Sequence, residues 1–182
     1  MITEIDLREV LVRSLGSAHR DLVTRSTGAK VRCTIEEALS TQPADDPVVL
    51  DFSSVRVLDC SCADEVVAKL LLRRADSHDA GPWFLIRGLG EGQAEEIDHV
   101  LRRRRLALVA EERGGQPRLL GEVDPSAAAA WDVLAGRGGA GAEEIAAALR
   151  LALTEAQRAL EALVDAGVAR EAEGRYLPLT AA

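Results

Sequence analysis

Four small polar residues, Asp59-Cys60-Ser61-Cys62, are the side chains of this chain best suited to chemistry. They precede a segment with apolar residues at helical spacing, so we expect them to open a helix. A helix N-terminus carries unpaired backbone N–H groups and the positive end of the helix dipole, which favour added negative charge. Ser61 is therefore a candidate phosphorylation site, and Asp59, Cys60 and Asp64 are candidates for a partner-binding surface around it.

Several of these residues also have a purely structural interpretation. Ser61 could instead cap the helix by accepting hydrogen bonds from free N–H groups, and the same alternative applies to Asp59. Asp64 and Glu65 fall in the first helical turn, where acidic side chains suit the dipole, and this structural role is the favoured one for both.

The cysteines do not form a metal site by sequence. Cys60 and Cys62 make a C-x-C pair with no second pair and no neighbouring histidine, so we expect both to be small buried residues. An odd total of three cysteines does not indicate a disulfide framework either, which makes a reducing cytoplasm the expected location.

The segment around these residues resembles a known family. An apolar strand (Val48–Leu50) continues as Leu50-Asp51-Phe52, and Asp59–Glu65, DCSCADE, opens an amphipathic helix. This order is similar to that of STAS domains of anti-sigma-factor antagonists. The resemblance covers roughly residues 1–121 and implies an α/β domain that binds a partner protein, often a kinase-type ATP-binding anti-sigma factor. It places the family's phosphorylated position at Cys60, with Ser61 next to it.

The first two thirds of the chain alternate between helical and strand patterns. This alternation predicts an α/β fold with a mixed sheet and packed helices over residues 1–121. Besides the segment above, the expected helices are Leu7–Leu15, an amphipathic segment with Val31, Ile35 and Leu39, and Glu95–Arg105. The expected strands are Trp83–Ile86, Leu106–Ala110 and a possible edge strand at Arg118–Leu120, with a turn at Gly88–Gly92.

The last third, residues 122–182, has a different pattern. Two helices are expected at Ala127–Leu134 and Ala142–Leu149, separated by a break at Gly136–Gly141, and Thr154 and Gln157 have the capping-box spacing for a third. A hairpin around Glu173-Gly174-Arg175 follows. Three helices and a hairpin resemble a winged helix-turn-helix, so we expect a small second domain of α+β class.

A winged helix raises DNA binding as an alternative function. The residues that would contact DNA are Thr154, Gln157, Arg158, Arg170 and Arg175. Residues 122–182 carry ten acidic side chains against five arginines, however, whereas a DNA-binding domain usually presents a basic face. Ala156 and Ala159, expected to be exposed, add few base-contacting groups. A protein-contact or dimerisation module is therefore favoured.

Composition excludes several classes of function. The 182 residues have a net charge of −8, which disfavours general attraction to nucleic acid, and no apolar run approaches the roughly 18 residues of a membrane helix. No nucleotide loop, catalytic triad or metal-ligand set is present, so neither enzymatic activity nor a cofactor is expected. Arg102–Arg105 is the basic run, interpreted as a solvated helix end or a patch for an acidic partner. The sequence predicts a cytoplasmic regulatory protein that binds a partner protein, or forms a homo-oligomer or a subunit of a larger complex.

Overall fold

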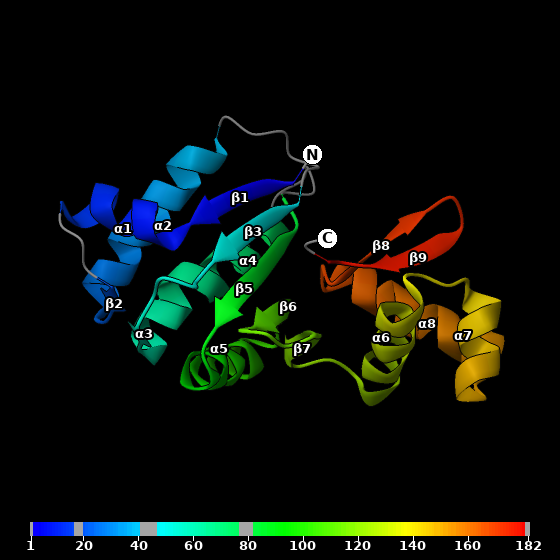
Figure 1. Cartoon of the computed structure of the whole chain (residues 1–182). Coiled ribbons are helices and arrows are strands. Elements are labelled where there is room, and N and C mark those ends of the chain that lie inside the picture. The colour runs from blue at the N-terminus through cyan, green and yellow to red at the C-terminus, as the bar shows by residue number, and fades with distance from the viewer. Residues whose placement is uncertain (1, 17–19, 41–46, 77–81, 181–182) are drawn as a thin grey trace.

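The computed structural model describes residues 2–16, 20–40, 47–76 and 82–180 (Figure 1). The fold is a mixed α/β structure built on a five-stranded sheet of order β1-β3-β5-β6-β7. The first four strands in this order are parallel, and β7 pairs antiparallel with β6 at the edge. The strands are β1 (Thr3–Asp6), β3 (Val48–Asp51), β5 (Phe84–Leu89), β6 (Ala107–Glu112) and β7 (Pro117–Gly121).

Helices connect the parallel strands and cover one face of this sheet. Neighbouring strands follow one another along the chain, and right-handed crossovers then place every connecting helix on the same side. Leu50, Ile86 and Leu108 point to this side and pack with the helices in one apolar core. The helices are α1 (Leu7–Leu15), α2 (Arg25–Leu39), α3 (Cys60–Ala63), the π-helical turn η1 (Asp64–Ala68), α4 (Lys69–Asp76) and α5 (Glu91–Arg104).

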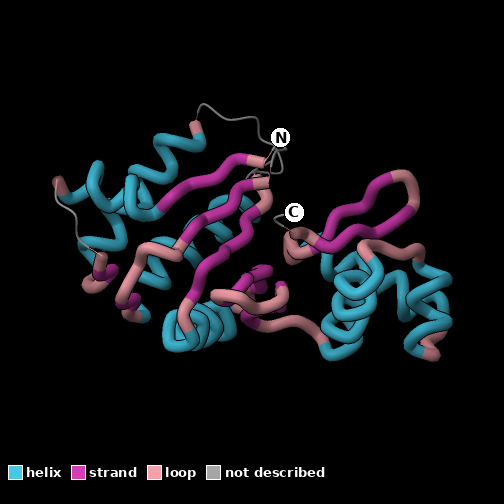
Figure 2. The backbone as a smooth tube through the Cα atoms, viewed as in Figure 1, coloured by secondary structure: helices cyan, strands magenta, loops and turns pink. Residues whose placement is uncertain are grey.

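The other face of the sheet packs against the C-terminal third. Val49, Leu85 and Val109 alternate with the residues of the first core and join a second core with Trp131 and Leu134. Three helices and a hairpin lie together on this side (Figure 2). They are α6 (Pro125–Arg137), α7 (Ala142–Leu149), α8 (Leu153–Asp165), β8 (Ala169–Ala172) and β9 (Arg175–Pro178).

Two of the expected helices have the predicted bounds, α1 at Leu7–Leu15 and α7 at Ala142–Leu149, whereas other expected elements occur at shifted bounds. Gly88 and Leu89 extend β5 where a turn was predicted, and α5 begins four residues before the predicted Glu95. Gly136 lies inside α6, because the helix ends only at Gly138, whose φ of 71° is left-handed. The sequence analysis did not predict β1, whose alternating polar residues gave it no apolar run.

A two-stranded parallel pair sets the starts of two helices side by side. It consists of β2 (Asp21–Leu22) and β4 (Val57–Leu58), and each strand leads within two residues into a helix. Helices α2 and α3–η1 then pack so closely that a Cβ on Gly28 would lie 2.9 Å from the Cβ of Glu65 and 3.1 Å from the Cα of Cys62. Only glycine at position 28 allows this contact.

We expect Gly28→Ala to destabilise the chain by about 1–3 kcal/mol, because the new methyl group must push apart two packed helices. Urea unfolding would measure this change. Gly136→Ala is the matched control, since a Cβ there meets no atom within 4 Å. It should stabilise its helix by up to about 1 kcal/mol. Equal midpoints for the two variants would contradict the close packing at Gly28.

Candidate partner-binding site

Asp59 is the residue that caps α3. Its Oδ1 accepts a hydrogen bond from the backbone N–H of Cys62 at 2.8 Å, and its Oδ2 accepts one from the N–H of Thr24 at 2.8 Å. Of the two candidates for the cap, the structure selects Asp59 and corrects the interpretation of Ser61 as the cap. Ser61 lies two residues inside the helix, where its hydroxyl forms no hydrogen bond with any described residue.

Thr24 connects the starts of α2 and α3. It caps α2 with φ 74° and ψ 142°, a backbone conformation that costs a β-branched residue about 1–3 kcal/mol. The carboxylate of Asp59 holds its N–H, and the Sγ of Cys62 donates to its carbonyl oxygen at 3.0 Å. These contacts hold the two helix starts in a fixed arrangement.

The two cysteines of the C-x-C pair have opposite environments. Cys62 is fully buried, and burial, followed by the charge of Asp59, raises the pKa of its thiol to about 12. Cys60 is exposed, which corrects the expectation that both are buried. Their side chains point about 200° apart around a helix, so only one can face the core.

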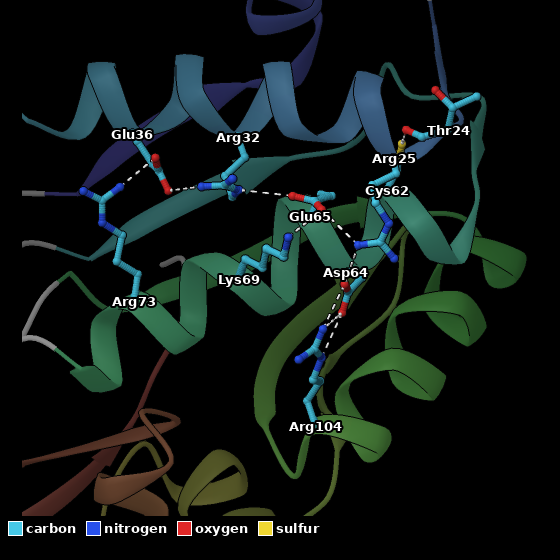
Figure 3. A network of polar contacts seen from close by, with 10 residues as sticks. All are labelled: Thr24, Arg25, Arg32, Glu36, Cys62, Asp64, Glu65, Lys69, Arg73 and Arg104. Atoms are coloured by element: carbon cyan, nitrogen blue, oxygen red, sulfur yellow. Dashed lines mark hydrogen bonds and ion pairs between the residues drawn. The ribbon is translucent and has the colours of Figure 1, made fainter.

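Asp64 and Glu65 lie in the first turn of η1, and they are buried and ion-paired, which the role predicted for them did not include (Figure 3). Asp64 is 8% exposed and accepts from both Nε and Nη2 of Arg104, each at 3.0 Å. Arg25, the first residue of α2, donates to Asp64 at 3.2 Å and to Glu65 at 3.0 Å. The pairs connect three helices, α2, η1 and α5.

The network continues from Glu65 along α2. Glu65 is 3% exposed, and Lys69 donates to its Oε1 at 2.6 Å, while the Nε of Arg32 lies 3.5 Å from Oε2. Arg32 also pairs with Glu36 at 2.8 Å, and Glu36 pairs with Arg73 at 2.6 Å (Figure 3). A buried acid is thus surrounded by cations from two helices.

These contacts decide the protonation of the two acids. Burial by itself would raise the pKa of each carboxyl, but hydrogen bonds from Arg104 and Arg25 hold the pKa of Asp64 below its usual value. Hydrogen bonds from Lys69 and Arg25 do the same for Glu65. Both side chains therefore stay ionised near neutral pH, although they are buried.

Ser61 and Cys60 line a cavity of about 310 Å³ between α2, α3 and α5. Its charged lining consists of Arg25, Arg103, Arg104 and Asp64. The last two residues of α5 thus contribute a positive edge to the predicted phosphorylation site. Arg103 forms no ion pair with any described residue, so its charge is free. All four residues of the run Arg102–Arg105 are exposed at the end of α5, as expected for a solvated helix end, although Arg104 also pairs with Asp64.

The structure places the alternative DNA-contacting residues on α8 and the hairpin. Thr154, Gln157 and Arg158 are exposed, and so is Arg170. Arg175 forms an ion pair, in which its Nη1 lies 3.1 Å from the carboxylate of Glu144.

Two expectations for α8 are wrong. Ala156 and Ala159 are buried, at 0% and 3% exposure, because they face the second core. The helix start is not at Thr154 either, since Ala152 precedes the first turn and its N–H donates to Glu155.

Metal-binding groups and membrane-spanning helices are both absent from the part of the chain that the structure describes. In residues 2–16, 20–40, 47–76 and 82–180, no group of three or more His, Cys, Asp or Glu side chains could hold a metal ion. Over the same residues no helix combines the length and apolarity needed to cross a bilayer. Comparison with protein-family models, curated proteins and solved structures finds no match. Function therefore has to be argued from the site itself.

Replacing the buried acids should weaken the acid sensitivity of the fold. In the folded state both carboxyl pKa values lie below their unfolded values, so folded chains bind fewer protons and stability falls as pH drops below about 4. We expect Asp64→Asn/Glu65→Gln to lose about 1–3 kcal/mol at pH 7 and to approach the unaltered chain at acid pH. Denaturant unfolding across pH measures this, and Glu95→Gln, at an exposed position, is the control. A constant difference at every pH would contradict the assignment.

Thiol labelling should separate the three cysteines. Cys33 and Cys60 are exposed and should react with a maleimide in the native state, whereas buried Cys62 should react only after unfolding. Mass spectrometry counts the labels. Cys62→Ala is the control, because unfolding should then add no label. Equal labelling rates at all three positions would contradict the buried environment of Cys62.

Proposed function

We propose that this chain is a non-enzymatic regulatory protein whose STAS-like part, residues 1–121, binds a partner protein at the Ser61 cavity. The observation that carries this proposal is a free Ser61 hydroxyl and an exposed Cys60 thiol beside Arg103, whose charge no described carboxylate compensates. A cationic, accessible cavity suits an acidic segment of a partner. By resemblance, the partner would be a kinase-type ATP-binding protein of the anti-sigma-factor kind, in the cytoplasm.

Phosphorylation of Ser61 would act as the switch. A phosphoserine carries about −1.5 to −2 charges near neutral pH. Within this cavity the phosphate would lie beside Arg25, Arg103 and Arg104 and would pair with them. The charge that attracts an acidic partner is then cancelled, and docking weakens. Neither a cofactor nor a catalytic residue is needed.

The C-terminal part, residues 122–182, would serve as a winged-helix-like contact or dimerisation module. DNA binding remains the alternative, supported by exposed Thr154, Gln157 and Arg158 on α8. It is disfavoured because Arg175 is already paired with Glu144, which leaves Arg170 as the unpaired arginine of the hairpin. The excess of acids in this part also opposes binding to phosphates.

For a partner protein that copurifies with this chain from native lysate, we expect Ser61→Asp to weaken binding at least about tenfold, which corresponds to about 1.4 kcal/mol, because the added carboxylate pairs with the arginines of the cavity. Ser61→Ala should bind normally, and Arg103→Ala should bind weakly and with a reduced salt dependence. Affinity measurement on the purified pair tests all three.

Ser126→Asp is a matched control, because Ser126 is also the second residue of a helix that follows an aspartate, Asp124. It should bind like the unaltered chain. Equal loss for Ser61→Ala and Ser61→Asp would contradict the switch. A salt-sensitive gel shift with DNA that Arg158→Ala abolishes would support the alternative function.

A further inference from the structure

A second cavity, of about 450 Å³, lies where β5 ends and α5 begins. Its walls come from the residue before β2, the segment before α3, the beginning of α5 and the turn after β6. It shares no lining residue with the Ser61 cavity. Three arginines line it, Arg20, Arg56 and Arg113, in a chain whose net charge is −8. The lining of this cavity is thus positive although the chain as a whole is negative, and the proposed binding at Ser61 does not account for this difference.

Two of these arginines have no compensating acid. The Nε of Arg113 donates to the carbonyl of Gly88 at 3.1 Å, and its Nη2 donates to that of Ser53 at 2.9 Å. The Nε of Arg20 donates to the carbonyl of Ser54 at 3.0 Å. Carbonyl oxygens orient a guanidinium without neutralising it, and neither arginine forms an ion pair with a described carboxylate. Both charges are therefore held in place and remain available.

The third arginine and the remaining acid complete the charge balance. Arg56 is neutralised by Asp21 through two hydrogen bonds, at 2.9 Å and 2.6 Å. Glu96 is the acid on the lining, and it forms no ion pair within the described part of the chain. The cavity therefore keeps a net positive charge even when Glu96 is counted.

The frame of the cavity is rigid on the side of α5. Gln93 is 6% exposed, and both the oxygen and the nitrogen of its amide form a hydrogen bond. Its Oε1 accepts from the N–H of Gly90, and its Nε2 donates to the carbonyl of Val55, each at 2.9 Å. This side chain fixes the first turn of α5 to the opposite wall. A preorganised site loses less entropy when a ligand binds.

Apolar side chains form the rest of the surface. Val57 is 44% exposed although it belongs to a strand, and Leu58 lies next to it. The volume of the cavity falls in the range of small-molecule sites, about 300–1,000 Å³. A ligand that fits therefore needs a doubly charged anionic group for the arginines and a small apolar part for the valine.

We propose that this cavity binds a phosphate monoester with a small apolar organic part. The phosphate lies between the guanidinium groups of Arg20 and Arg113, which match its oxygens in geometry and charge. The organic part contacts Val57. A free metabolite or a phosphorylated side chain of a protein would present this same chemistry.

Calorimetric titration of the full chain with phenyl phosphate tests the proposal. Saturable binding is expected, weaker for inorganic phosphate, which lacks the apolar part, and weaker for benzoate, which carries a single charge. Arg20→Gln should weaken the affinity at least tenfold, and Glu96→Gln should strengthen it. Since Arg113 also holds backbone carbonyls, Arg113→Lys is the variant to use there, and it should weaken binding while keeping the charge.

Arg103→Gln, in the other cavity, is the matched control and should bind phenyl phosphate normally. A phosphotyrosyl peptide that binds more tightly than phenyl phosphate would identify a protein as the source of the phosphate. Absence of saturable binding, or affinity unchanged in Arg20→Gln, would overturn the proposal. Loss of binding in Arg103→Gln alone would also overturn it, because the ligand would then occupy the Ser61 cavity.

Discussion

The ion pairs of Asp64 and Glu65 are the contacts on which the candidate site depends. Consecutive residues on a helix point in different directions, and here Asp64 pairs with Arg104 of α5 while Glu65 faces α2. Arg25 contacts both. Removing one partner from a buried pair is far more costly than the net stabilisation the pair provides, because an uncompensated charge stays behind. The pairs therefore fix the positions of three helices more than they add to stability.

The same pairs determine the charge beside Ser61. Asp64 forms ion pairs with Arg25 and Arg104. Arg103 is therefore the arginine of this cavity that pairs with no described carboxylate. In the proposed switch, a phosphate on Ser61 would compete with Asp64 for the same two arginines. Modification would then loosen the contact between α2 and α5 as well as cancel a surface charge. Such competition gives a physical route from one added group to a change in the partner-binding face.

Sequence periodicity predicted most helices, yet it could not show that Asp64 and Glu65 are buried. An acid in a first helical turn is explained locally by the dipole, so nothing prompted a search for partners. Those partners lie far away in sequence, Arg25 in α2 and Arg104 in α5. One signal was available in the sequence: the acids lie between Cys62-Ala63 and Val66-Val67-Ala68, small and apolar residues, and the structure buries this whole segment. A helix enclosed on all sides leaves no solvated face for a charge.

The sequence indicates the burial of the second face of the sheet more clearly than the burial of the two acids. Strands buried on one face alternate between apolar and polar residues, whereas Val48-Val49-Leu50 and Leu108-Val109-Ala110 are apolar throughout. Such runs indicate a layer on both faces, and the C-terminal helices supply the second one. The predicted boundary near residue 121 does not separate two cores, because Val49, Leu85 and Val109 pack in one cluster with residues of the C-terminal helices.

Helix α5 lines both cavities, the second one near its start and the Ser61 cavity at its end. It is held at both places, by Gln93 at the first turn and by the pair between Arg104 and Asp64 at the last. With Ser61 unmodified, α5 is therefore held at both ends, whereas coupling between sites requires an element with two arrangements. Ligand binding at the start of α5 is therefore expected to act independently of docking at Ser61, and the two proposals stand or fall separately.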